Sequence, residues 1–270
     1  MSERAEGTRR RLYGAQDMVR ISSSSCAGCG ACCRGMSDTI VPDPYDVWQM
    51  GLITGKTFEE LMGAGIDLHV EEGVILPHLM MKKDTEGCFF LGEDGRCTIH
   101  AYRPGICRLF PLGRQYDEEK TSYFIVPEGC VKGGLSKVRI DKWLGIPDLP
   151  AYEDFKSRWH SFIRTLTARI AAEQSDEIRR NINLYFLRLF FVQPYNQNPS
   201  ASTFYEDVSD RMKRFADAVL LGQRLSTYSA FITGMVMEEP SIIRALTSLY
   251  MPYILTGTPS GGSWPCIVLV

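Results

Sequence analysis

The sequence lacks the features that would place the protein in a membrane or on a nucleic acid. No apolar run reaches the roughly 18 residues of a membrane span, and the most apolar stretch, Ile182 to Val192, is shorter and contains Arg188. The 30 basic and 32 acidic side chains nearly balance, so no general positive field attracts nucleic acid. The charged amino-terminal stretch has no apolar segment and is not expected to be a secretory signal. We therefore expect a cytoplasmic protein with neither a membrane nor a nucleic-acid partner.

Catalytic signatures are also missing from the sequence. It contains no Walker, HExxH or Gly-x-Ser-x-Gly motif. The Cys-x₃-Cys-x₂-Cys loop of radical S-adenosylmethionine chemistry is absent as well. The four histidines are scattered, and His78 is expected to be packed or at the surface rather than to act as a ligand or base. The motifs therefore leave open whether the protein is an enzyme.

Cysteine, in contrast, is abundant, and eight of the nine cysteines lie in the first half of the chain. Disulfide bonds are not expected, because the count is odd, the cytoplasm is reducing, and the neighbours Cys32 and Cys33 are poorly placed to bridge each other. Cys266 lies in a Gly-Ser-Pro tail and is expected to take no part. Cys-x₂-Cys spacing lets thiolates converge on one metal centre. The candidate metal ligands are Cys26, Cys29, Cys32, Cys33, Cys88, Cys97, Cys107 and Cys130.

The spacing of these cysteines favours an iron–sulfur cluster, most simply [4Fe–4S], over zinc. Iron–sulfur clusters readily take three ligands from one loop, whereas structural zinc more often takes two pairs. Eight candidates allow one centre with spectators or two centres of four. Adjacent side chains diverge, so Cys32 and Cys33 can serve different centres. Arg103 and Arg108 lie beside cysteines and are expected to support the centre from outside its ligand set.

The two cysteine-rich segments together resemble a known family. CAGCGACC supplies Cys-x-x-Cys-x-x-Cys-Cys, and the stretch from Gly87 to Pro111 supplies Cys-x-Phe-Leu, then Cys-x-Ile, then Arg-Pro-x-x-Cys-Arg-x-Phe-Pro. This pattern resembles the YkgJ-type cysteine-cluster proteins, known as zinc- or iron-chelating domains with a CxxCxxCC motif, over about residues 22 to 135. His100 stands where that family usually has Tyr.

Flagellin lysine N-methylase carries a similar domain. That relation implies a methyltransferase-like activity on protein lysines, with S-adenosylmethionine as cosubstrate and a protein as substrate. Two alternatives come from other classes. One is a non-catalytic zinc- or iron-binding module that engages a protein partner, and the other is a redox or electron-transfer iron–sulfur protein, including an iron–sulfur oxidoreductase.

The first half carries local signals for two short elements. Asp43 before Pro44 predicts the start of a helix. Tyr45 and Trp48, one helical turn apart on it, are expected to cover the cysteine cluster. The GEDG turn between two apolar stretches predicts a β-hairpin whose strands contain Cys88 and Cys97.

The second half has helical periodicity. Residues 152–173 carry an apolar stripe that predicts a helix. Ser175 is expected to cap a second helix that runs through Val192. Thr203 and Glu206 are expected to form the capping box of a third helix, to about residue 221, and a shorter helix is expected after Pro240.

These patterns predict an α+β protein, mostly α. Irregular cysteine-rich metal-binding loops with a short β-hairpin would pack against a carboxyl-terminal helical bundle. The expected organisation is a flexible tail (1–20), a cysteine-cluster metal-binding domain (21–140), a helical region packed on it (141–256) and a second flexible tail (257–270).

Overall fold

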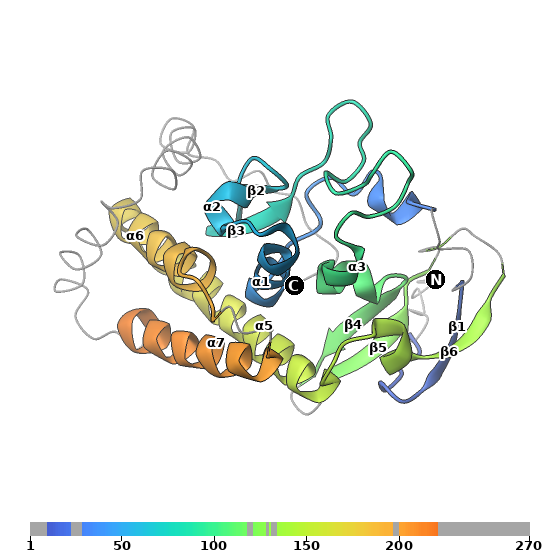
Figure 1. Cartoon of the computed structure of the whole chain (residues 1–270). Coiled ribbons are helices and arrows are strands. Elements are labelled where there is room, and N and C mark those ends of the chain that lie inside the picture. The colour runs from blue at the N-terminus through green and yellow to red at the C-terminus, as the bar shows by residue number, and fades with distance from the viewer. Residues whose placement is uncertain are drawn as a thin grey trace, which may run out of the picture.

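The computed structural model describes residues 10–22, 29–117, 121–127, 130, 134–196 and 200–220. Cys26, Cys266 and the helix expected after Pro240 lie outside these ranges. The described part is mixed α and β, as predicted, with small two-stranded sheets and with its long helices in the second half (Figure 1). None of its helices combines the length and the apolar character that a membrane crossing needs.

The strands form three antiparallel pairs. They are β1 (Met18–Ile21) with β6 (Ser136–Arg139), β2 (Ile66–Glu71) with β3 (Val74–Leu79), and β4 (Leu112–Tyr116) with β5 (Thr121–Ile125). The sequence analysis predicted a hairpin only around the GEDG turn, so these three pairs were missed.

The helices differ in length between the two halves. The short ones are η1 (Ala31–Cys33), α1 (Pro44–Thr54), α2 (Phe58–Leu61), η2 (His100–Tyr102), α3 (Gly105–Leu109) and α4 (Ile140–Leu144). The long ones are α5 (Leu149–Ala171), α6 (Asp176–Leu187), which continues as the π-turn η3 (Arg188–Val192), and α7 (Ala201–Phe215), which continues as the π-turn η4 (Ala216–Leu220).

Helix α1 begins as the sequence predicts. The carboxylate of Asp43 accepts the backbone N–H of Asp46, and the carboxylate of Asp46 accepts that of Asp43. Pro44 fits the first turn, where its missing N–H costs no helical hydrogen bond. Asp43 also accepts a hydrogen bond from Lys156 of α5 at 2.5 Å, and both side chains are buried. Asp43 therefore both caps α1 and links α1 to α5 through a buried ion pair.

Helix α5 carries the predicted apolar stripe and is the longest element. It begins three residues earlier than expected, because Asp148 caps it by accepting the N–H of Ala151. In Figure 1 it crosses the molecule from the β4–β5 pair to α6. Its buried aromatic side chains pack on α6, η3 and α7; the ring pairs include Trp159 with Phe190 and Phe162 with Phe215. Burial of each such side chain stabilises the fold by about 1.5–3 kcal/mol.

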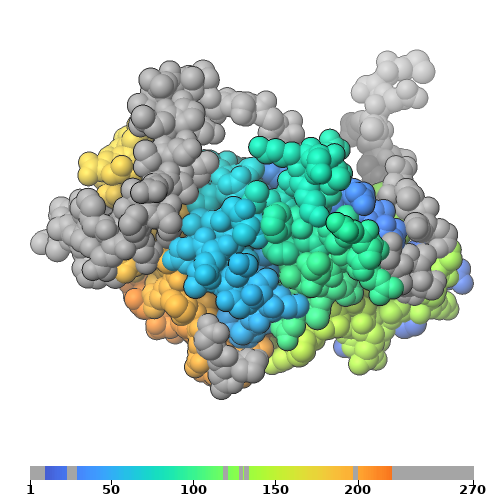
Figure 2. Space-filling view, turned by 45° about the horizontal axis from the view of Figure 1, so that its top comes forward, coloured from blue at the N-terminus to red at the C-terminus, as the bar shows by residue number. Residues whose placement is uncertain are grey.

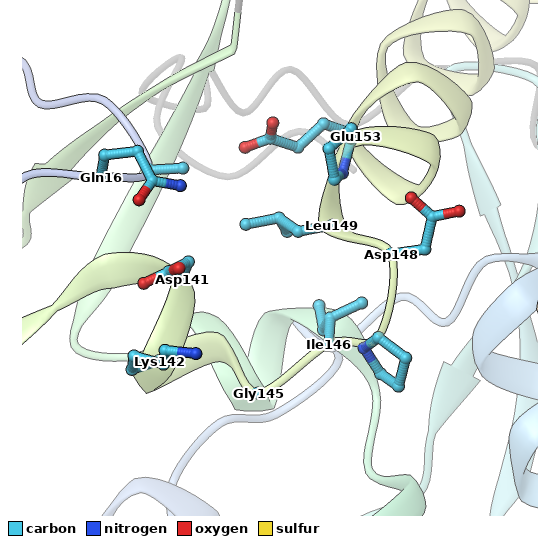
Figure 3. A pocket seen from close by; sticks show the side chains of 11 residues that line it. Gln16, Asp141, Lys142, Gly145, Ile146, Asp148, Leu149 and Glu153 are labelled. Carbon is cyan, nitrogen blue, oxygen red and sulfur yellow. The ribbon is translucent and has the colours of Figure 1, made fainter.

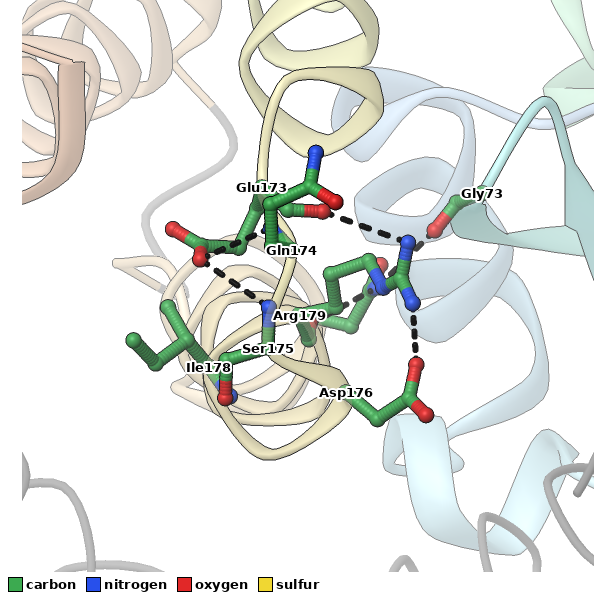
Figure 4. A network of polar contacts seen from close by, with 8 residues as sticks. Gly73, Glu173, Gln174, Ser175, Asp176, Ile178 and Arg179 are labelled. Atoms are coloured by element: carbon green, nitrogen blue, oxygen red, sulfur yellow. Dashed lines mark hydrogen bonds and ion pairs between the residues drawn. The ribbon is translucent and has the colours of Figure 1, made fainter.

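The turn between α5 and α6 anchors the β2–β3 pair. Ser175 caps α6 as predicted, by accepting the N–H of Ile178. Arg179 donates to the carbonyl oxygen of Glu173 beside Gly73 (Figure 4). The fully buried Asn183 accepts the N–H of Ile75 and donates to the carbonyl oxygen of Gly73, at 2.8 and 3.0 Å. The side-chain amide of Asn183 therefore pairs with one backbone N–H and one carbonyl oxygen at the start of β3, where α6 covers the strand.

The expected capping box of α7 is wrong. The helix begins at Ala201, directly after Ser200. Thr203 therefore lies inside the first turn, where its hydroxyl donates to the carbonyl oxygen of Ser200. Phe204 and Val208 are buried on the first two turns of this helix.

Tyr45 and Trp48 do not have the expected role of covering the cysteine cluster. The ring of Tyr45 stacks on Tyr205, with centroids 5.7 Å apart, and the ring of Trp48 stacks on Phe204 at 5.0 Å. The one-turn spacing correctly predicts a shared apolar face. That face meets α7, an element more than 150 residues away in the sequence.

Candidate metal centre

The two cysteine-rich segments lie side by side. The backbone N–H of Cys88 donates to the carbonyl oxygen of Cys33 at 2.7 Å, and the N–H of Gly35 donates to that of Glu86 at 2.9 Å. Arg34 and Gly87 form an antiparallel bridge between these two contacts. The segment after η1 therefore runs alongside the start of the second segment, although 55 positions separate their cysteines in the sequence. The blue and blue-green surfaces of this half of the chain adjoin on one face in Figure 2.

The second segment folds back at the predicted turn. The N–H of Gly92 donates to the carbonyl oxygen of Arg96 at 2.8 Å, and the backbones of Leu91 and Cys97 form an isolated antiparallel β-bridge. Cys88 and Cys97 consequently lie on the two arms of a tight hairpin, as expected. Only isolated bridges form along these arms, so the hairpin is a turn with short pairing rather than a regular strand pair.

Gly30 allows the first segment to approach this hairpin. Its φ is +59°, a conformation that favours glycine. A Cβ atom at this position would lie 3.1 Å from the carbonyl oxygen of Gly95 and 3.2 Å from a methyl carbon of Leu91. A larger residue would therefore separate the two cysteine-rich segments.

Helix α3 brings in Cys107. The backbone N–H of Gly105 donates to the buried carboxylate of Asp46 at 2.8 Å. A Cβ atom on Gly105 would lie 2.0 Å from the hydroxyl oxygen of Tyr152. Contacts with α1 and α5 thus fix the position of α3, and with it the side of the cluster on which Cys107 lies.

Five cysteines from both segments are close enough to alter one another's pKa values. They are Cys32, Cys33, Cys88, Cys97 and Cys107. The thiol of Cys33 donates a hydrogen bond to the sulfur of Cys32, which lowers the pKa of Cys32 to about 6 and raises the pKa of Cys33. Burial, and then repulsion from neighbouring thiolates, raises the pKa of the remaining three. Thiols grouped in this way ionise together only if a cation neutralises them.

Arg103 and Lys82 are cations that the protein itself supplies to this group, and Lys82 favours the thiolate form of Cys88. Arg103 favours the thiolate forms of Cys32 and Cys97. Burial, and then repulsion from Arg108, lowers the pKa of Arg103, and the thiolate of Cys107 opposes that shift. Arg108 has a different part, because its Nε donates to the carbonyl oxygen of Arg103 and its Nη2 to that of Ala101. Arg108 therefore holds the loop that carries Arg103.

A sulfur-only donor set suits a soft metal such as zinc or iron and does not suit magnesium or calcium. Within the described residues, no three His, Cys, Asp or Glu side chains are arranged so that they could hold a metal ion. Cys29 lies in the same loop and Cys130 beyond β5, both partly accessible. The complete ligand set therefore stays a prediction.

His78 has a structural environment in β3. It is buried, with 1% of its surface exposed, and its Nδ1 contacts the carbonyl oxygen of Asp38. Its ring stacks on that of His69 with centroids 4.5 Å apart. Burial lowers the pKa of His78, and the neighbouring His69 lowers it further. This packed position agrees with the expectation for His78.

Comparison with known protein families identifies the cysteine-rich segment. Residues 25–131 match a family model. It is the model of the CxxCxxCC family, described as "Putative zinc- or iron-chelating domain", and the match covers about two fifths of the chain and all eight candidate cysteines. No curated protein and no solved structure matches the chain. Residues 25–131 are thus similar to a domain of the CxxCxxCC type that is described as zinc- or iron-chelating.

Proposed function

We propose that this protein holds an iron–sulfur cluster where its two cysteine-rich segments meet. The observation that carries the proposal is the hydrogen bond from Cys88 to Cys33, together with the electrostatic interactions that join five thiols of both segments. Ligands would come from Cys26, Cys29, Cys32 and Cys33 on one side and from Cys88, Cys97, Cys107 and Cys130 on the other.

The preference for iron–sulfur over zinc rests on the first segment. Three cysteines at two-residue spacing in one loop suit a cluster that takes its fourth ligand from elsewhere. A bound iron–sulfur cluster supplies one-electron transfer. The chain itself would provide thiolate ligands, the charge of Arg103 to offset their negative charge, and the apolar side chains of Phe90, Leu91 and Ile99, which are buried around them.

Metal and acid-labile sulfide analysis of the anaerobically purified protein tests this proposal. We expect iron and sulfide in equal amounts, with the brown colour of a cluster. Zinc without sulfide would reject the iron–sulfur cluster and leave a zinc centre on the same cysteines. A protein that contains neither metal, even after reconstitution with iron and sulfide or with zinc, would reject both.

A second candidate function is binding of a protein substrate or partner through a lysine side chain. A pocket of about 500 Å³ lies between the amino-terminal segment, α4 and the start of α5. Figure 3 shows Glu153, Leu149 and Gln16 projecting toward its centre, with Asp141 and Lys142 on another wall. An aliphatic stem against Leu149 and an ammonium group beside Glu153 would suit this lining.

Lysine methylation from S-adenosylmethionine is the enzymatic form of this second candidate. Calorimetric titration with S-adenosylmethionine, and with a lysine-containing peptide, tests it. Binding of both, with loss of peptide binding in Glu153→Gln, would support a methyltransferase-like activity. Binding of the peptide alone would favour a non-catalytic module, and binding of neither would reject the second candidate.

A further inference from the structure

A buried arginine with a purely structural role has a recognisable environment in this fold. Arg211 of α7 is 1% exposed. Its Nε and Nη2 donate to the carboxylate of Asp207, its Nη1 donates to the carbonyl oxygens of Leu189 and Gln193, and its Nη2 also donates to that of Pro194. Each nitrogen of its guanidinium group therefore has a partner, and its charge has a carboxylate.

Arg114 in β4 has a different environment. Its Nε and Nη2 atoms are enclosed by protein and have no hydrogen-bond partner among the described residues. Its Nη1 lies 3.3 Å from the hydroxyl oxygen of Tyr116. Burial raises the pKa of Tyr123, and a charge and hydrogen-bond interaction with Arg114 opposes that rise. None of the ion pairs found in the described part of the chain involves Arg114. The guanidinium group of Arg114 thus interacts with tyrosine hydroxyls, has no carboxylate partner among the described residues, and keeps two enclosed nitrogens, Nε and Nη2, without a close acceptor.

Three tyrosines surround this guanidinium group. Its central carbon lies 6.0 Å from the ring centre of Tyr116, 5.8 Å from that of Tyr123 and 5.3 Å from that of Tyr152. Ring faces attract the positive charge but do not accept the in-plane N–H bonds of the guanidinium group. The hydroxyl of Tyr152 is itself enclosed and lacks a partner in the described structure. The Nε and Nη2 atoms of Arg114 and the hydroxyl of Tyr152 are therefore three enclosed donors without a close hydrogen-bond partner in the described structure.

The nearby carboxylates are occupied by other groups. Glu153 accepts a hydrogen bond from the hydroxyl of Tyr123 and forms no ion pair with Arg114. Asp43 accepts from Lys156, and Asp46 accepts from the backbone of Gly105. Among the described residues, none of these three carboxylates forms an ion pair with Arg114.

We propose that Arg114, Tyr116 and Tyr152 form a binding site for a small oxyanion, either a phosphate group or a carboxylate. Both chemistries present two oxygens that match the paired N–H groups of a guanidinium, and a phenol hydroxyl completes the set. Arg114 and Tyr116 are partly accessible as whole residues, but the unpartnered nitrogens and the Tyr152 hydroxyl are enclosed, so entry of an anion requires one of these side chains to move. The donors of this site, Arg114, Tyr116 and Tyr152, are distinct from the candidate cysteine ligands, although Tyr152 also packs on Gly105 of the helix that carries Cys107.

Thermal unfolding of the full-length protein tests the site. Melting temperatures are compared in inorganic phosphate, in acetate and in sodium chloride at equal ionic strength and pH. We expect phosphate or acetate at about ten times its Kd to raise the melting temperature by roughly 3 °C above chloride. The anion that gives the larger rise identifies the ligand as phosphate-like or carboxylate-like.

Substitutions assign the effect to Arg114. Arg114→Met should abolish the anion-dependent rise while leaving the melting temperature in chloride unchanged or higher, because it removes an uncompensated buried charge. Tyr152→Phe should weaken the rise. Two control variants should retain the anion-dependent rise. Arg139→Met removes an exposed ion pair. Arg211→Met should lower the melting temperature in chloride, because it leaves the carboxylate of Asp207 without its ion-pair partner.

Two outcomes would overturn the proposal. One is a wild-type melting temperature that is the same in phosphate, acetate and chloride. The other is an Arg114→Met variant that melts well below the wild type in chloride yet keeps the full anion effect, because Arg114 would then be a structural residue like Arg211. Metal content measured on the same preparations should be the same in Arg114→Met and the wild type, which separates this test from that of the cysteine cluster.

Discussion

The backbone N–H of Cys88 donates a 2.7 Å hydrogen bond to the carbonyl oxygen of Cys33. This contact joins the two cysteine-rich segments through their main chains rather than through their sulfurs. The two segments are therefore in contact through protein atoms alone, and a metal bound between them would add to that contact. This relationship leads to the first two predictions.

Serine replacement at Cys29 or Cys107 should lower both the metal content and the yield of soluble protein. Metal binding contributes directly to folding stability when the ligands come from loops with little apolar surface. Cys266→Ser is the control and should change neither quantity. Metal content per chain, measured by elemental analysis, checks the prediction; full metal content in Cys107→Ser would remove Cys107 from the ligand set.

Gly30→Ala should separate the two segments and destabilise the protein by about 2 kcal/mol, because it combines an unfavourable positive φ with a close contact to the backbone of Gly95. Gly35→Ala is the matched control. Gly35 has a similar φ of +64°, and no atom lies within 4 Å of the added methyl group. Its cost should stay near 1 kcal/mol. Urea unfolding measures both, and equal costs would show that the contact between Gly30 and Gly95 is not tight.

Asn183→Ala should cost about 3 kcal/mol of stability. The substitution leaves the N–H of Ile75 and the carbonyl oxygen of Gly73 without their partners at a buried edge. Asn181→Ala on the same helix is a suitable control, because that residue is only partly buried, and its effect should stay within about 0.5 kcal/mol. Chemical denaturation of the two variants gives the comparison. A cost below 1 kcal/mol for Asn183→Ala would mean that water replaces both hydrogen bonds.

Asp46 should make the protein less stable as the pH rises toward neutrality. Burial, and then repulsion from Asp43, raises the pKa of Asp46 to about 7. In the unfolded chain the same carboxyl ionises near pH 4. Between these two values the folded state binds more protons than the unfolded state, so the free energy of unfolding falls as pH increases from about 4 to about 7.

Urea unfolding across this pH range, in the wild type and in Asp46→Asn, isolates the contribution of Asp46. The slope of stability against pH should be less negative in the variant, because other titrating groups, including the cysteines, remain in both proteins. Parallel pH profiles would contradict the raised pKa of Asp46.

The sequence by itself determined the elements that depend on neighbouring residues. The start of α1 depends on Asp43 and Pro44, and the start of α6 depends on Ser175; both follow from side chains that satisfy the first N–H groups of a helix. The turn between Cys88 and Cys97 follows from its Gly and Asp residues. The choice of cysteine as the candidate donor follows from spacing, which is also a local property.

Only the tertiary structure decided which surfaces meet. The apolar face of Tyr45 and Trp48 could be predicted from its helical period, but its partners on α7 could not, because any apolar surface satisfies such a face equally. The unpaired state of Arg114 was likewise invisible in the sequence, since it depends on where Tyr123 and Tyr152 lie and on which carboxylates other groups already occupy. Hydrogen-bond satisfaction is a property of positions in space, and distant segments supply those positions only after the chain has folded.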